Sequence, residues 1–393
     1  MKKRLILTVG VLDTLDIFTY AMQGEFEKLG YDILLFDTRK MTESLGALSR
    51  FAAQPVTAML CFNNLGFNME LVPGKNVWEE LHIPPVNILM DHPYMHRNAL
   101  DHAPKNAIVL VIDREHIKYL NRFYPDLMAV GFLPHGGNVP DQTPGKLSDR
   151  SIPLMYAGGV SLPGVATPLP DLSAFDFDAK AVADEALSLL IEEPEHTVEA
   201  ALEQILLGHD IRLSDPELLD VITSLHFIDG KAVSHFREKL IRSLTKAGLP
   251  VVLYGNNWQY LDWIGCYPSL DFRGRVSSFE IVRKMLDTKI VLNTMTWFKD
   301  GTHDRIFNGM LSKAAVVSDR SRYMEENFEN EKELILFDLK EIPALSEKIA
   351  GLLSEEDRLQ EIASCGYHRA LEKESWPARA RELDKDLFTD LSS

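Results

Sequence analysis

The chain has 393 residues, of which 46% are apolar and 25% charged. This length suits two or three domains, and the composition excludes disordered, collagen-like and fibrous proteins. Its 41 basic and 58 acidic side chains give a net charge of −17, which disfavours nucleic-acid and anionic-lipid partners.

The first apolar run, 5–12, follows three basic residues as in a secretion signal. Acidic residues at 13 and 16 interrupt it and no small-residue cleavage site follows, so the run predicts a buried first strand. No apolar stretch reaches the eighteen residues that a membrane span requires. The three cysteines show no metal-ligand spacing and favour a reducing, cytoplasmic location, with no metal site; they are Cys61, Cys266 and Cys365.

Residues 1–137 alternate short apolar runs with helix-length stretches, which predicts a parallel sheet covered on both faces. A helix is expected over Phe18–Leu29, because Gly30 follows as a C-terminal glycine. The predicted strands are 5–12, 31–36, 57–62, 86–90 and 108–112.

Asp91 and His92 directly follow the strand at 86–90. At the carboxyl end of a strand, a carboxylate or an imidazole can accept a proton from a hydroxyl group, so both are candidate catalytic residues. A structural histidine-rich turn is the alternative. His135 and Gly136 form a second polar cluster, which either lines a cleft or serves as a hinge. The Pro- and Gly-rich segment 138–150 predicts an interdomain linker.

Residues 151–375 form a second α/β series with a mostly helical insertion at about 165–245. Residues 165–231 hold fifteen acidic and three basic side chains, so −12 of the net charge lies there. A solvated helical surface and a docking surface for a protein partner both explain this charge. Two such lobes place a ligand in the cleft between them. A C-terminal helix is expected over 376–393, after the break at Trp376-Pro377, and it could pack back on the first lobe.

The segment 272–319 carries the strongest local signals. Ser277 and Glu280 form a capping box that predicts a helix at 278–287, followed by a strand at 289–294. Thr302 is expected to cap the next helix, which begins near His303. The free N–H groups of that first turn could hold a diphosphate, and Arg305 could add a charge-assisted bond.

This segment resembles the nucleotide-sugar half of GT-B glycosyltransferases, which have two Rossmann-like lobes, and more narrowly the CgeB-like and group 1 glycosyltransferases. Asp300 and Asn308 hold the positions of that family's acidic pair, and the run 309–317 partly matches the segment that follows it. The resemblance implies that Asn308 contacts the ribose, as an amide in place of the family's acid.

The resemblance also implies donor contacts in the second lobe and an acceptor in the first. Gly158 and Gly159 would let the backbone approach the phosphates, although a plain tight turn is the alternative. Asn257 and Trp258 would face the base, unless Trp258 belongs to the core. Arg275 would contact phosphate, unless it is merely exposed.

The expected function is therefore transfer of a sugar, of the hexosyl type, from a nucleoside-diphosphate sugar to an unidentified protein or glycan, with no further cofactor. The Asp-x-Asp pair at 176–178 lies away from the expected donor site, so a metal-independent reaction is predicted. A base such as Asp91 suits inversion of configuration, whereas the family resemblance favours retention. A sugar-nucleotide epimerase and a degenerate sugar-nucleotide-binding protein are the alternatives.

Overall fold

The computed structural model describes residues 3–11 and 14–391. It divides the chain into two compact units. Unit 1 comprises residues 1–138 and 372–393, and unit 2 comprises residues 139–371. Each unit is described by itself.

Unit 1 contains a parallel sheet that, among the described residues, has six strands in the order β2-β1-β3-β6-β7-β8. All five strands predicted for this region are present. Four of them are buried on both faces, whereas the edge strand at 32–37 is mostly half-buried. The predicted strand 5–12 ends at Val9, and its last residue, 12, lies outside the described residues. The strands are β1 (Arg4–Val9), β2 (Asp32–Asp37), β3 (Ala58–Phe62), β6 (Pro85–Leu89), β7 (Ile108–Val111) and β8 (Ala129–Phe132); β4 (Glu70–Val72) and β5 (Lys75–Asn76) form a separate hairpin.

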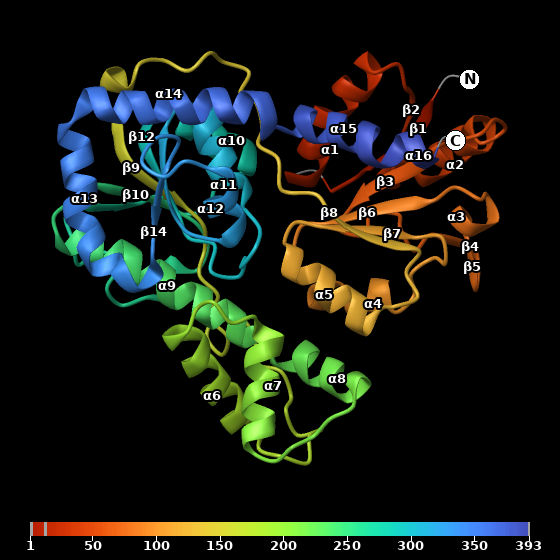
Figure 1. The fold of residues 1–393 in the computed structure, drawn as a ribbon, viewed down its shortest axis with the longest axis horizontal. Coiled ribbons are helices and arrows are strands. Elements are labelled where there is room, and N and C mark those ends of the chain that lie inside the picture. The colour runs from red at the N-terminus through yellow and green to blue at the C-terminus, as the bar shows by residue number, and fades with distance from the viewer. Residues whose placement is uncertain (1–2, 12–13, 392–393) are drawn as a thin grey trace. The chain divides into compact units, whose positions relative to one another are not determined.

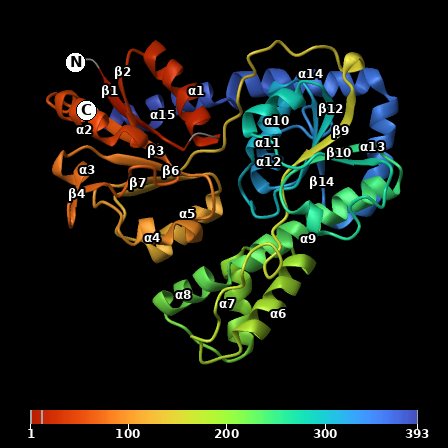
Figure 2. The same ribbon diagram turned by 180° about the vertical axis from the view of Figure 1, so that it is seen from behind.

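Helices cover both faces of this sheet, with α1 and α15 on one face and α4 and α5 on the other (Figures 1 and 2). The C-terminal segment thus packs within unit 1, where α15 lies against α1. The helices of this unit are α1 (Thr14–Lys28), α2 (Met41–Phe51), α3 (Val77–Glu80), α4 (Arg97–Leu100), α5 (Arg114–Phe123), α15 (Trp376–Leu383) and α16 (Thr389–Leu391).

Unit 2 contains a second parallel sheet of six described strands, in the order β11-β10-β9-β12-β13-β14. This is the strand order of a Rossmann fold, and the two sheets together confirm the predicted fold class. The strands are β9 (Ile152–Ala157), β10 (Val251–Tyr254), β11 (Leu270–Phe272), β12 (Thr288–Asn293), β13 (Ala315–Asp319) and β14 (Ile335–Phe337).

Four helices connect β9 to β10, and α6, α7 and α8 extend away from the sheet of unit 2 (Figure 1). The predicted helical insertion begins later than expected, because residues 165–178 contain no helix and α6 starts only where Asp178 caps it. The helices of this unit are α6 (Ala179–Glu192), α7 (Val198–Gly208), α8 (Asp215–Leu225), α9 (Phe227–Lys246), α10 (Ser278–Met285), α11 (Asp304–Leu311), α12 (Arg322–Asn327), α13 (Ile342–Ser354) and α14 (Glu356–Lys373), which ends in unit 1.

Candidate functional site

The strand order of unit 2 reverses at β9, because β10 and β11 lie on one side of it and β12 to β14 on the other. Ligands of open parallel sheets bind at the carboxyl ends of the strands beside such a reversal. In this unit the turn Gly158-Gly159 follows β9, and the loop that starts at Thr294 follows β12. This edge is the candidate site.

Gly158 and Gly159 leave no room for a side chain in this turn. A Cβ atom on Gly158 would lie 3.1 Å from Nη2 of Arg305, and one on Gly159 would lie 3.0 Å from the backbone of Asn256. The structure therefore brings two of the predicted glycines beside the predicted arginine. Close approach of neighbouring groups, rather than a left-handed backbone, requires glycine here.

Arg305 lies in the first turn of α11, and only 6% of the residue is exposed. Its Nη1 donates a hydrogen bond to Oδ1 of Asn293 at the end of β12, and its guanidinium lies 5.3 Å from the centre of the Tyr156 ring. Burial lowers the pKa of Arg305, and the charge of Arg237 lowers it further. A buried cation in this position favours a bound anion.

Arg237 is a second cation of the site, and no motif in the sequence points to it. It comes from α9, donates a hydrogen bond to the carbonyl of Gly159 and lies 5.0 Å from the centre of the Trp297 ring. Neither Arg237 nor Arg305 forms an ion pair with a carboxylate among the described residues. Two uncompensated guanidinium groups thus flank the Gly158-Gly159 turn, an arrangement that suits a diphosphate.

The start of α11 differs from the prediction in its capping residue. His303, not Thr302, is the N-cap, since its Nδ1 accepts a hydrogen bond from the backbone N–H of Arg305 at 3.1 Å. Thr302 is fully buried, and its hydroxyl has no hydrogen-bond partner. Thr302 directly precedes His303, and threonine is among the preferred capping residues whereas histidine is not, which explains the error.

Asp300 and Asn308 contact different partners. The carboxylate of Asp300 lies 3.5 Å from Nε of Arg322 at the start of α12. Asn308 donates a hydrogen bond from its amide to Asp304, 3.1 Å away and one helical turn earlier. The carboxylate of Asp304 thus lies beside Asn308, the expected ribose contact.

Trp258 belongs to the hydrophobic core, which corrects its prediction as an aromatic wall. It is 0% exposed, and its indole N–H donates to the carbonyl of Gly158 at 2.7 Å. The amide of Asn257 is also engaged, because it donates to the carbonyl of Val160 at 2.8 Å. Both residues therefore hold the backbone of the glycine turn in place.

Arg275 is exposed in the loop before α10.

Asp91 is exposed at the carboxyl end of β6 in unit 1. Asn63, just after β3, fixes it by donating a hydrogen bond to its carboxylate at 2.9 Å. The same Asn63 side chain accepts a bond from the backbone N–H of Met90 at 2.8 Å, so its amide is held from both ends. The sequence contained no signal for Asn63, because the pairing depends on the neighbouring strands.

His92 is buried, which favours the structural histidine-rich turn that was the alternative to a catalytic role. Its Nδ1 accepts from the backbone N–H of Tyr94, and its ring stacks on the Tyr94 ring with centroids 4.0 Å apart. His116 lies against the other side, 4.3 Å between centroids. Burial, with the charges of His92 and His96, holds the pKa of His116 well below its ordinary value.

His135 and Gly136 are fixed by packing within unit 1. Gly136 lies against the indole of Trp376, so a Cβ atom there would come within 2.7 Å of the ring. The next residue, Gly137, donates to the carbonyl of Glu374 at 2.7 Å. Packing therefore explains this glycine, and the hinge interpretation loses its main support.

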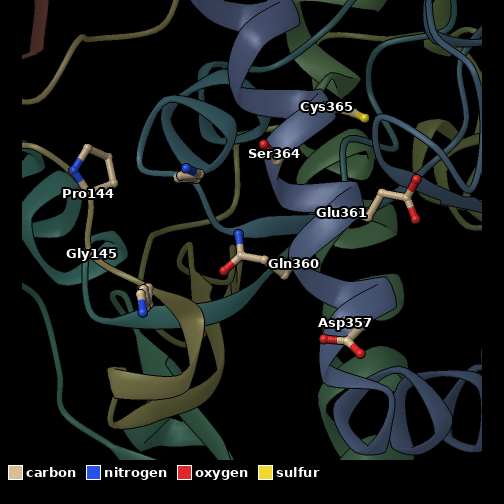
Figure 3. A pocket seen from close by; sticks show the side chains of 9 residues that line it. Pro144, Gly145, Asp357, Gln360, Glu361, Ser364 and Cys365 are labelled. Atoms are coloured by element: carbon tan, nitrogen blue, oxygen red, sulfur yellow. The ribbon is translucent and has the colours of Figure 1, made fainter.

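A hollow of about 660 Å³ lies at the opposite edge of the unit 2 sheet, before β9 and β13. Figure 3 shows that Gln360 and Ser364 of α14 face the Pro144–Gly145 segment across it, whereas Glu361 and Cys365 point away. It contains none of the predicted site residues.

Within residues 3–11 and 14–391, no cluster of histidine, cysteine and acidic side chains has the arrangement of a metal site. In this same part of the chain, no helix combines the length and the apolar character that crossing a bilayer demands.

Part of the chain matches a known protein family. Residues 236–385 match the family model described as glycosyl transferase-like. No curated protein matches the chain.

Three solved structures share the fold along the whole chain. HepE of Anabaena, in complex with UDP and glucose, has a TM-score of 0.53 and 13% identity, with 100% of both chains covered. Sucrose-phosphate synthase of Thermosynechococcus elongatus has a TM-score of 0.52 and 11% identity, covering 100% of this chain and 99% of that one. An α-glucosyltransferase in complex with UDP and DNA has a TM-score of 0.57 and 10% identity, covering 99% and 100%. These likenesses confirm the GT-B fold.

Proposed function

We propose that this glycosyltransferase of the GT-B fold transfers a sugar from a nucleoside-diphosphate sugar to the hydroxyl group of an acceptor, without a metal ion. The observation that carries the proposal is the pair of guanidinium groups, Arg305 and Arg237, which flank the Gly158-Gly159 turn without a carboxylate partner. Two of the similar structures contain UDP, which supports a diphosphate as the anion.

The reaction requires stabilisation of a leaving group. The acceptor oxygen forms a bond to the anomeric carbon while the bond from that carbon to the diphosphate oxygen breaks, and the electron pair leaves with the diphosphate. Arg305 and Arg237 would bind the increased negative charge, and the N–H groups at the start of α11 would add hydrogen bonds. Two cations on the chain can do this work in place of a metal ion.

The remaining predicted donor contacts belong to the same proposal. The backbone at Gly158 and Gly159 would lie against the phosphates. Asp300 and Asn308 would face the sugar and the ribose, with Asp304 supplying the carboxylate that Asn308 lacks. Arg275 would approach a phosphate from the loop before α10. A hexose is the sugar we expect.

In unit 1, we assign to Asp91 the handling of the acceptor hydroxyl. Its exposed carboxylate can accept the proton, and Asn63 holds it in one orientation. His92 would support the site indirectly, because its ring is buried and its Nδ1 accepts a hydrogen bond from the backbone N–H of Tyr94.

Thermal unfolding with a panel of nucleotide sugars tests the donor site. A ligand at about 100 times its dissociation constant stabilises the folded state by about 2.7 kcal/mol. Arg305→Ala and Arg237→Ala should each abolish most of that stabilisation, and Arg305→Lys should restore part of it. Arg212→Ala removes an exposed positive charge from the same unit and should leave the stabilisation intact.

Two results would contradict the proposal. The donor site is wrong if no nucleotide sugar stabilises the protein, or if both arginine variants keep the full stabilisation. Metal independence is wrong if donor consumption in the presence of an acceptor extract stops when EDTA is added and returns with Mg²⁺ or Mn²⁺.

A further inference from the structure

Asp319, the last residue of β13, is a buried carboxyl group beside the candidate site. It is 1% exposed, and both of its oxygens accept the backbone N–H of Met295, at 2.8 and 3.0 Å. Met295 is near the start of the loop that leads from β12 to His303. The carboxyl group therefore holds that loop at its first turn.

A chain of hydrogen bonds connects Asp319 to Arg305. The Ser318 hydroxyl donates to Asp319, with the backbone carbonyl 3.0 Å and Oδ1 3.3 Å away, and accepts a bond from the amide of Asn293 at 2.9 Å. The oxygen of that same amide accepts from Arg305. The two ends of the chain are a carboxyl group and a guanidinium cation, so the charge around one affects the other.

Asp319 has no basic partner within ion-pair distance among the described residues. Lys299 acts on it only through its field, since its ammonium group donates to the carbonyls of Pro194 and Thr296. Burial raises the pKa of Asp319 to about 7. The other charged or titratable groups on the packed elements are Arg305, Arg237, Tyr156, His303, Asp304, and the pair Asp300–Arg322.

Building on the proposed function, we infer that Asp319 is a positioning residue that couples binding of the diphosphate to the uptake of a proton. A bound diphosphate neutralises the positive charge of Arg305, which otherwise stabilises the Asp319 carboxylate. It also adds negative charge near that carboxylate. Both effects disfavour ionised Asp319. The protonated carboxyl group can still accept the bond from Met295, so the loop keeps its place.

Proton uptake by Asp319 makes the diphosphate bind more tightly as the pH falls, and protonation of the ligand itself cannot produce this direction of change. If the bound diphosphate raises the pKa of Asp319 from about 7 by one unit, the affinity should increase about fourfold from pH 8.5 to pH 7. Protonation of the ligand's phosphate, with a pKa near 6, acts in the opposite direction.

Isothermal titration of the full chain with UDP, and separately with inorganic pyrophosphate, tests the inference. At pH 7.5 in PIPES, HEPES and Tris, the dependence of the observed heat on the ionisation enthalpy of the buffer gives the number of protons taken up. We expect a net uptake of a fraction of a proton by the wild type. Asp319→Asn, which keeps an oxygen for Met295, should take up none and lose the increase in affinity towards pH 7.

His303 is the necessary control, because protonation of its imidazole beside the diphosphate would have the same sign. His303→Asn keeps a capping side chain, and its proton uptake should equal that of the wild type. If Asp319→Asn does not fold, infrared difference spectra of the wild type replace it. They should show the C=O stretch of a newly protonated carboxylic acid when UDP binds.

The inference is overturned if UDP binds without proton uptake, if Asp319→Asn takes up as much as the wild type, or if the uptake disappears in His303→Asn instead. Absence of any binding by UDP, pyrophosphate and the nucleotide sugars would contradict the proposed function itself. The two failures are therefore distinguishable.

Discussion

Gly136 is required by packing rather than by backbone flexibility. A Cβ atom there would lie 2.7 to 3.0 Å from three atoms of the rigid Trp376 indole. We predict that Gly136→Ala lowers the free energy of unfolding by about 1–3 kcal/mol, the usual cost of overpacking. Urea denaturation measures this change.

Gly24 is the matched control for that substitution. It lies inside α1, and nothing is within 4 Å of its added Cβ atom. Gly24→Ala should stabilise the protein by up to about 1 kcal/mol, since alanine has the higher helix propensity. Destabilisation by both variants would show that the crowding at Trp376 is not the cause.

The buried imidazole of His116 makes stability depend on pH. Its pKa in the folded protein is held well below the ordinary 6.5, so the unfolded chain binds a proton where the folded chain does not. Stability due to this group is therefore present above pH 6.5 and falls below it, by up to about 1.4 kcal/mol per pH unit.

Denaturation of His116→Gln between pH 7.5 and 5 measures this contribution. The variant should lose less stability on acidification than the wild type. His102→Gln, at an exposed histidine, should follow the wild-type curve. Equal slopes for all three proteins would rule out the neutral, buried imidazole.

At the scale of single elements, α10 depends on its capping box. Ser277 accepts a bond from the backbone N–H of Glu280, and the Glu280 carboxylate accepts from the backbone N–H of Ser277 in return. Ser277→Ala should cost about 0.5–2 kcal/mol of unfolding free energy.

The control is Ser188→Ala in the interior of α6, where the serine hydroxyl bonds only to the carbonyl of Asp184. Alanine suits a helix interior, so this change should be neutral or slightly stabilising. Both free energies come from urea denaturation, and equal effects would argue against the capping box.

The elements that could be predicted are those with local signals. The central strands of both sheets are uninterrupted apolar runs, and the box at Ser277 defines α10 by itself. The edge strands β8, β11 and β14 were not predicted, because an edge strand of three or four residues contains too few apolar side chains to form a pattern. The segment 165–178 is long enough for a helix, but it contains proline and aspartate residues that favour turns, which explains its lack of a helix.

In the candidate site, too, the residues that could be predicted are those with local signals. Gly158, Gly159 and Arg305 could be found because each stands next to a strand or a helix start. Arg237 could not be found in this way, because it lies in α9, which is far from the glycine turn in the sequence and reaches it only through tertiary packing. Trp258 is the opposite case, a residue that was predicted to face the base but belongs to the core. An aromatic residue at a strand end gives the same sequence pattern whether it faces a ligand or the core.

At the scale of the whole molecule, residues 372–393 belong to unit 1 although the preceding residues belong to unit 2. A buried ion pair holds this segment, with Nη2 of Arg379 2.5 Å from the Glu374 carboxylate and two further bonds from Arg379 to the carbonyl of His135. Breaking one partner of such a pair leaves a buried charge uncompensated. The stability of unit 1 therefore depends on a segment that follows unit 2 in the sequence.

Trp376 anchors this segment and offers a test of which unit depends on it. It is 0% exposed, and its ring lies 4.5 Å from that of Phe18 in α1 and 5.3 Å from that of Phe62 in β3. Trp376→Ala should cost about 3–5 kcal/mol, the range for a buried tryptophan. Amide hydrogen exchange should accordingly speed up in α1 and β3 while β9 to β13 stay protected.

Trp258→Ala is the matched control, because this tryptophan is equally buried but lies in the core of unit 2. It should produce the opposite pattern, with faster exchange in β9 and β10 and little change in α1. If Trp376→Ala instead exposed both sheets equally, the two units would unfold as one cooperative body. The assignment of the C-terminal segment to the stability of unit 1 alone would then be wrong, since local unfolding follows the contacts that a side chain makes.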